Sequence, residues 1–172
     1  MTRFYQDDFE TVKWLQSMPA GGYIANIRDV IIYRNNNDNG KTITFLIDIA
    51  EGEYQGYFDN MYLFDYEMKF DCGYVIQMPS EQDKLNSFIH ILQQSNPNFQ
   101  FHGDLSQLIG MEFGMVLQEQ ECIEPDGTSS IQLNVFEITT VETIRNNSYT
   151  YPKSPHCRYN NSTQYAKHGG GI

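Results

Sequence analysis

The chain has 172 residues, of which 22 are acidic and 11 are Lys or Arg, so its formal net charge is −11. This charge repels phosphate at long range, and a nucleic-acid site on this chain must overcome it locally. No apolar run approaches the roughly 18 residues that cross a bilayer, and the N-terminus lacks the basic and apolar regions of a signal peptide. The 3 cysteines lie far apart, which argues against a disulfide framework and against a zinc knuckle. We therefore expect a cytoplasmic protein with no membrane segment, no metal and no cofactor.

The sequence divides into three regions. Residues 1–20 are predicted to form an N-terminal helix and a linker, because a helical apolar stripe ends at Pro19 and two glycines. Residues 21–147 are predicted to form the folded domain, since a single core supports roughly 100 to 200 residues. Residues 148–172 are polar and lack apolar periodicity, so we expect a flexible C-terminal tail.

Two strands are predicted on either side of a polar loop. From Lys41 onward, apolar residues alternate with polar ones, as in a half-buried strand. The apolar positions are Ile43, Phe45, Ile47 and Ile49. Tyr23–Arg34 is rich in β-branched residues, and the loop Asn35–Gly40 joins the two strands as a hairpin because Asn, Asp and Gly tolerate positive φ. Three consecutive apolar residues interrupt the alternation of the first strand, so we expect either a β-bulge near Asp29 or a strand that is covered on both faces there.

A long irregular segment separates this hairpin from a third strand and a helix. Tyr54–Asp71 shows no clean period and is mostly acidic, which predicts an irregular excursion. Gly73–Met78 is predicted to form the third strand. Ser80 and Asp83 match a capping box at the start of a helix that ends before Asn96. The buried stripe of this helix is expected to hold Leu85, Phe88, Ile89 and Leu92.

The last part of the domain is predicted to form a second hairpin. Met111–Gln118 and Ile131–Val135 alternate between apolar and polar residues, as strands do. Pro125–Gly127 lies between them and is a turn signal, because Pro presets φ and Gly accepts the positive φ that follows. Leu105–Ile109 precedes this hairpin as a half-turn, and Val141–Asn147 follows it as a helical turn.

The predicted order of elements is hairpin, third strand, helix, hairpin. Five strands with one main helix between the third and the fourth is the plan of the OB-fold, a five-stranded Greek-key barrel. In that fold, the face of strands 2 and 3 and the two hairpin loops bind oligonucleotides or oligosaccharides. We therefore expect a mainly β, OB-fold-like barrel. A small α+β sandwich would give the same order of elements and stays an alternative.

The candidate ligand-binding residues are cations and aromatic rings. The sequence has no glycine-rich phosphate loop, no metal-spaced cluster and no nucleophile beside a base, so we do not expect an enzyme. Binding of single strands without sequence preference needs a groove, a few cations and aromatic faces. The expected nucleic-acid-binding residues are Arg28, Arg34, Lys41, Tyr57, Tyr62, Phe64, Lys69 and Tyr74. A place in the core is the alternative for the four aromatic residues, and Phe58 and Phe70 are the better core candidates because they lack a hydroxyl.

Two functions of different classes remain open at this point. The first is a non-enzymatic protein that binds single-stranded DNA. The second is a protein-interaction or assembly module whose exposed tyrosines contact another chain. A salt titration distinguishes them, because the affinity for DNA falls with salt when phosphates are neutralised.

Four segments resemble a family of small proteins from phages and integrative conjugative elements of Gram-positive bacteria. The matching segments are Pro19–Tyr23, Leu46–Phe58, Ile91–Phe99 and Val141–Arg145. Proteins of this family are similar to OB-fold single-stranded-DNA-binding proteins. The resemblance implies a role in the replication or recombination of a phage or mobile element. The candidate partners are single-stranded DNA, replication or recombination proteins of the same element, and further copies of the chain.

Overall fold

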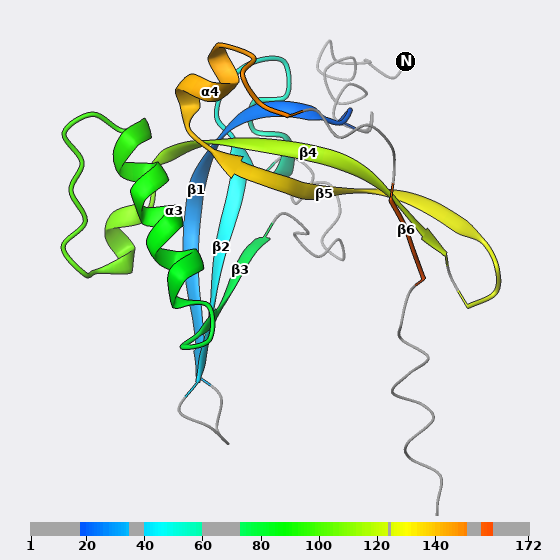
Figure 1. Cartoon of the computed structure of the whole chain (residues 1–172), viewed down its shortest axis with the longest axis horizontal. Helices are drawn as coiled ribbons and strands as arrows, with labels where there is room; N and C mark the ends of the chain where they lie inside the picture. The colour runs from blue at the N-terminus through cyan, green and yellow to red at the C-terminus, as the bar shows by residue number, and fades with distance from the viewer. Residues whose placement is uncertain (1–17, 35–39, 60–72, 124, 151–155, 160–172) are drawn as a thin grey trace, which may run out of the picture.

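The structure of the protein is a computed structural model that describes residues 18–34, 40–59, 73–123, 125–150 and 156–159 (Figure 1). The predicted N-terminal helix and most of the aromatic excursion lie outside these residues. The strands are β1 (Gly21–Arg34), β2 (Lys41–Ile49), β3 (Gly73–Met78), β4 (Glu112–Ile123), β5 (Ser129–Thr139) and β6 (His156–Tyr159). The helices are α3 (Gln82–Ser95), the 3-10 turn η1 (Leu105–Leu108) and α4 (Val141–Arg145). No helix among the described residues is long and apolar enough to cross a membrane.

The five main strands form one antiparallel sheet in the order β3-β2-β1-β4-β5. The sheet curls into a nearly closed barrel, in which the β4–β5 ribbon crosses over the β1–β2–β3 part (Figure 1). Among the described residues, the remaining opening lies between β3 and β5, which are not paired with each other. α3 lies between β3 and β4 in the chain. The predicted mainly β, OB-fold-like barrel is therefore confirmed.

β1 carries the predicted bulge. Ile27 pairs with Ile47, but the next pair along the ladder joins Asp29 to Leu46, so Arg28 is an extra residue on β1. Before the bulge, Ala25 and Ile27 are buried. After it, the even-numbered Val30 packs against the core instead. One extra residue thus lets both halves of a long, bent strand turn apolar side chains inward.

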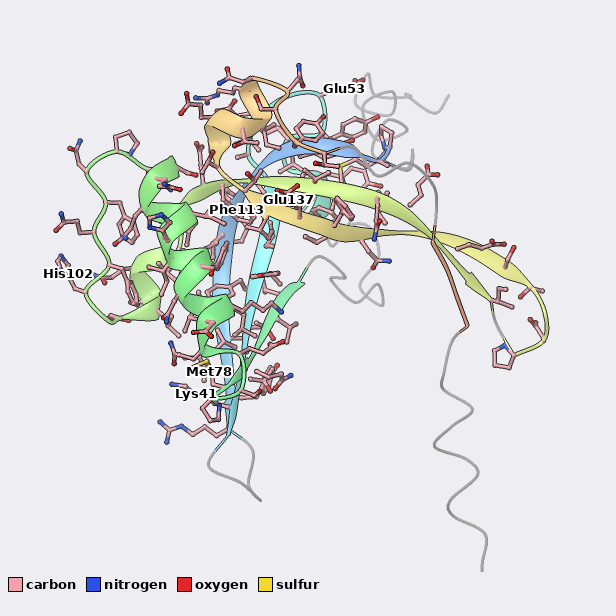
Figure 2. All side chains as sticks on the ribbon, in the orientation of Figure 1. Lys41, Glu53, Met78, His102, Phe113 and Glu137 are labelled. Atoms are coloured by element: carbon pink, nitrogen blue, oxygen red, sulfur yellow. The ribbon has the colours of Figure 1, made fainter. Side chains whose placement is uncertain are left out.

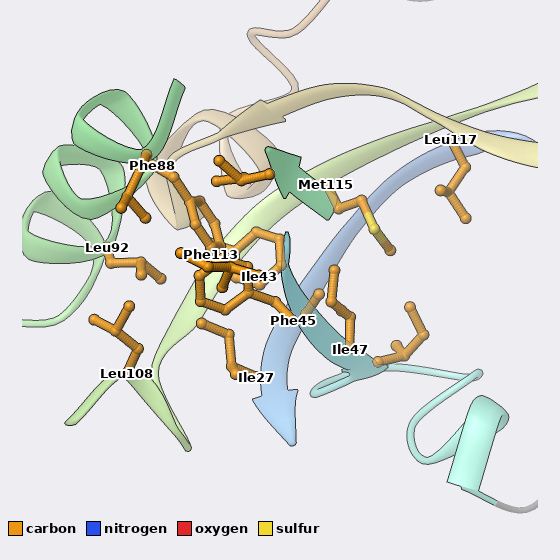
Figure 3. Close-up of a cluster of buried hydrophobic side chains, with 14 of the residues drawn as sticks. Ile27, Ile43, Phe45, Ile47, Phe88, Leu92, Leu108, Phe113, Met115 and Leu117 are labelled. Carbon is orange, nitrogen blue, oxygen red and sulfur yellow. The ribbon is translucent and has the colours of Figure 1, made fainter. Parts of the chain in front are cut away.

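The core lies between the barrel wall and α3 (Figure 3). Phe88 of α3 packs edge-to-face against Phe45 of β2 and Phe113 of β4, with ring centroids 5.1 Å and 5.2 Å apart. Each such pair contributes about 0.5–1.5 kcal/mol beyond its buried area. Leu85 and Leu92 of the same helix are also buried, which confirms the apolar stripe predicted for it.

The two ends of α3 are held by polar contacts that differ from the prediction. The predicted capping box is wrong, because the N-cap is Glu81 and no side chain caps the helix. The Ser80 hydroxyl instead donates to the carbonyl oxygen of Gln77, and the Glu81 carboxylate accepts from the Gln77 N–H. At the other end, the Asn96 amide donates to the carbonyls of Leu92 and Glu112, which ties the helix to β4.

A second apolar cluster and a short strand complete the fold. Val141 and Ile144 of α4 pack on Ile24 and Val116, on the sheet side opposite the main core. Within the range predicted as a flexible tail, β6 pairs in parallel with the distal half of β4. The sequence did not predict this strand. Two parallel strands are not joined by a tight turn, so no turn signal in the sequence marks a parallel strand as short as β6.

Candidate functional site

Alternation along β2 and β3 separates a buried face from an exposed one. Ile43, Phe45 and Ile76 point inward and are fully buried. The residues between them point outward, because successive side chains of a strand point to opposite faces. Cross-strand neighbours on the outward side form three rows over β1, β2 and β3, and we call them the outer face. The rows are Tyr33–Thr42–Gln77, Ile31–Thr44–Val75 and Asp29–Leu46–Gly73.

The outer face combines one aromatic ring with short polar and apolar side chains. Tyr33 is 60% exposed and Val75 is 39% exposed. The Thr42 hydroxyl donates to the Gln77 side-chain oxygen at 2.8 Å, so these two side chains are held side by side next to Tyr33. Gly73 contributes no side chain to the third row. This is a flat surface on which a base could stack against the Tyr33 ring.

Arg34 and Lys41 lie at one end of the outer face. They are cross-strand neighbours at the closed end of the β1–β2 hairpin, and both are exposed. Neither forms an ion pair with any residue that the structure describes. Alternation directs them to the side of Met78, which lies next to Lys41 at the tip of the sheet (Figure 2). They therefore lie beside the first row at the tip of the sheet, but they point to the opposite side of the strands from Tyr33 and Thr42. Their side chains are long and exposed, so a phosphate at the tip can reach them.

Arg28 lies at the opposite end of the outer face. It is the extra residue of the bulge, and its guanidinium Nη2 lies 2.6 Å from Oδ2 of Asp59. The side chains of both residues are partly exposed. Among the described residues, Arg34 and Lys41 are therefore in no ion pair, whereas Arg28 is bound to a carboxylate.

A buried carboxylate fixes the chain that follows β2. Asp48 is only 2% exposed and accepts hydrogen bonds from the backbone N–H groups of Ile49, Phe58 and Asp59 at 2.8, 2.9 and 3.2 Å. Burial raises the pKa of Asp48, and these three hydrogen bonds oppose the increase. Asp48 thus anchors the start of the excursion, including Asp59, to the sheet.

Two of the four aromatic residues expected to stack lie elsewhere. Tyr57 is 7% exposed and belongs to the core, with its ring edge-to-face against Tyr54 and Phe58. Tyr74 lies opposite Phe45 on the inward side of β3, and its ring packs against Phe88. Tyr57 is therefore a core residue and Tyr74 packs against the core, which is the alternative that the sequence left open for both. Burial raises the pKa of both hydroxyls.

The other expected site residues have mixed outcomes. Tyr62, Phe64 and Lys69 lie outside the described residues, as does Phe70. Phe58 is partly buried and packs on the core, as predicted. Among the described residues, no group of three or more His, Cys, Asp and Glu could hold a metal ion.

Tyr33 and Val75 were missed as site residues. Their signal was present in the sequence, because counting the alternation onward from the predicted bulge at Asp29 places Tyr33 outward.

The comparisons with known proteins assign no family to the chain. No family model matches it, and no curated protein is similar enough to match. The positions and contacts of the side chains on the outer face therefore carry the argument for its function.

Proposed function

We propose that this protein is a non-enzymatic single-stranded-DNA-binding protein. The observation that supports this function most directly is the exposed Tyr33 ring on the outer face, with Arg34 and Lys41 next to it at the tip of the sheet and Arg28 at the other end. In OB-folds, this face of strands 2 and 3 and the adjacent hairpin loop bind oligonucleotides.

The chemistry of the outer face matches recognition without sequence preference. A base stacked on an aromatic side chain contributes about 1–3 kcal/mol, whichever base it is. Phosphates are neutralised by Arg34 and Lys41, neither of which is in an ion pair with a carboxylate of the described residues. The formal net charge of −11 is compatible with this site, because salt screens charges beyond about 8 Å under physiological conditions.

The biological setting is part of the proposal. The resemblance of the four segments, among them Leu46–Phe58, to proteins of phages and integrative conjugative elements supports a role in replication or recombination of such an element. The expected partners are single-stranded DNA and the replication or recombination proteins of the same element.

Fluorescence anisotropy with a labelled oligothymidylate tests this function. The wild-type chain should bind at low salt and release the DNA as salt rises. The Arg34→Ala, Lys41→Ala double variant should bind more weakly and lower the slope of log K against log salt by about 1.4, which corresponds to two phosphates on a single strand. Arg145→Ala is the control, because Arg145 lies on α4 and not at the outer face. Absence of binding by the wild-type chain at low salt would contradict the proposal.

A protein-interaction module is the second candidate. The exposed Ile32 and Val75 favour it, because β-branched side chains on an accessible sheet suit contact with another chain. Under this alternative, the oligothymidylate titration shows no binding at any salt concentration.

A further inference from the structure

We propose that Asp59 is a built-in competitor for phosphate at Arg28, which holds the affinity of the outer face for DNA below what its cations would allow. This inference rests on the proposed function. It concerns how that site is regulated, and it follows from three features of the described residues around the bulge.

The first feature is the position of Arg28 on the ligand side of the sheet. Ile27 points inward and is buried, whereas Asp29 shares a row of the outer face with Leu46. The Arg28 guanidinium contacts Asp59, whose backbone is bound to Asp48. Asp48 alternates with the inward residues of β2 and so lies on the outer side. This chain of contacts places the Arg28 guanidinium at the end of the outer face.

The second feature is the kind of contact. The guanidinium fork matches a carboxylate and a phosphate equally well. Nη2 of Arg28 lies 2.6 Å from Oδ2 of Asp59, and the two side chains are 51% and 41% exposed. A phosphate that approaches the outer face can therefore reach the same donors, and it must displace Asp59 to bind them.

The third feature is that the competitor is held in place. The carboxylate of Asp48 accepts from the N–H groups of Phe58 and Asp59, which fixes the backbone of Asp59 against β2. Asp59 therefore needs to order only its own side chain to reach Arg28. Because exposed ion pairs are weak, a phosphate can still replace it, and the contact reduces affinity without abolishing binding.

The molecule contains a matched ion pair away from the outer face. Nη2 of Arg145, on α4, lies 2.6 Å from Oε1 of Glu51, and the side chains are similarly exposed. Neutralising Glu51 changes the net charge by the same amount as neutralising Asp59, but it frees Arg145 on α4 and not the bulge residue of β1.

The test compares Asp59→Asn with Glu51→Gln in the full chain, with labelled oligothymidylate as the probe. Asp59→Asn should bind up to about five-fold more tightly at low salt, the range expected when a weak surface ion pair no longer competes. Its salt slope should steepen by about 0.7, which corresponds to one further phosphate. Glu51→Gln should leave both quantities unchanged. In an Arg28→Ala background, Asp59→Asn should have no effect.

The outcomes separate the inference from the function on which it rests. Wild-type binding that Asp59→Asn leaves unchanged overturns the inference alone. An equal gain from Glu51→Gln, or a gain that persists without Arg28, also overturns it, because either result shows a general charge effect. Absence of binding by both the wild-type chain and Asp59→Asn overturns the function and the inference together. Asp59→Ser should repeat the gain, since the backbone N–H that Asp48 holds is kept, and melting curves verify that each variant is folded.

Discussion

At the scale of single residues, the place of each tyrosine in the fold decides whether its ring is exposed or buried. Tyr33 and Tyr57 have the same side chain, but Tyr33 is exposed on the outer face and Tyr57 is buried against Tyr54 and Phe58. Local composition does not distinguish them. The alternation of β1 after its bulge does, because it turns Tyr33 away from the core.

Replacing each of these tyrosines with Ala should therefore give opposite results. Tyr33→Ala is expected to weaken oligothymidylate binding by about 1–3 kcal/mol, the value of one stacked base, with little change in the urea midpoint. Tyr57→Ala should lower the free energy of unfolding by about 3–5 kcal/mol, since it leaves a large cavity in the core. Anisotropy and urea titrations measure the two quantities. Unchanged binding by Tyr33→Ala would remove this ring from the site.

Asp48 should make the free energy of unfolding rise as pH falls, which is the opposite of the usual effect of a carboxylate. Burial raises its pKa in the folded chain above the ordinary value of 3.8, so the folded state binds its proton more tightly than the unfolded state does. As pH falls through the raised pKa, this residue therefore adds to the free energy of unfolding. Relative to Asp48→Asn, the wild-type chain should gain stability between neutral pH and about pH 3.

Asp126 is the control for this pH dependence. Hydrogen bonds from the Thr128 hydroxyl and N–H lower its pKa, so its contribution to stability is lost as pH falls. Relative to Asp126→Asn, the wild-type chain should lose stability over the same range. Urea titrations at a series of pH values measure both differences, and a difference of the same sign for the two residues would contradict the role assigned to Asp48.

At the scale of elements, α4 depends on a close approach to β4. A Cβ atom on Gly114 would lie 2.5 Å from the carbonyl oxygen of Thr140 and 2.6 Å from the Ile144 side chain. Thr140 is the N-cap of α4, where its hydroxyl accepts from the Thr143 N–H. Glycine at this position thus lets the cap and the helix rest directly on the strand.

Gly114→Ala should force α4 away from the sheet and lower the free energy of unfolding by about 1–3 kcal/mol, the usual effect of overpacking. Gly73→Ala is the matched control in another strand, because its Cβ would meet only the Thr44 methyl group at 3.3 Å. Urea unfolding of both variants tests this contrast. Equal losses would show that strand glycines, and not the approach of α4, limit stability.

The elements also show what local patterns can reveal. The five main strands, α3 and the bulge follow from alternation and helical spacing, which are properties of neighbouring residues. The start of α3 was predicted wrongly because Ser80 is used by the preceding turn through Gln77. β6 escaped prediction because its pairing with β4 depends on residues distant in the chain. In the candidate site, Arg34 and Lys41 were expected from the fold plan, whereas the exposed ring of Tyr33 was not.

At the scale of the whole molecule, few cations are available to a ligand. Among the described residues, Arg28, Lys84 and Arg145 are in ion pairs with carboxylates, whereas Arg34 and Lys41 are not. Within the described part of the chain, the cations available to DNA thus form a small, local contact.

The wild-type salt dependence should accordingly be shallow. Two phosphates neutralised by Arg34 and Lys41 give a slope of about −1.4 for log K against log salt on a single strand. Anisotropy titrations over a range of salt concentrations measure it. A much steeper slope would show that cations outside the described residues, such as Lys69, also contact the DNA.

The bulge at Arg28 has a consequence for how this gene can change. Because the extra residue shifts the alternation of β1 by one position, loss of a single codon there would exchange the two sides of the strand from Asp29 to Arg34. Tyr33 would then turn into the barrel, and Val30 would turn into water. Most substitutions alter one contact, but this deletion would alter every contact of that half-strand at once. Natural variants of the chain are therefore expected to keep the length of β1 even where they change its residues.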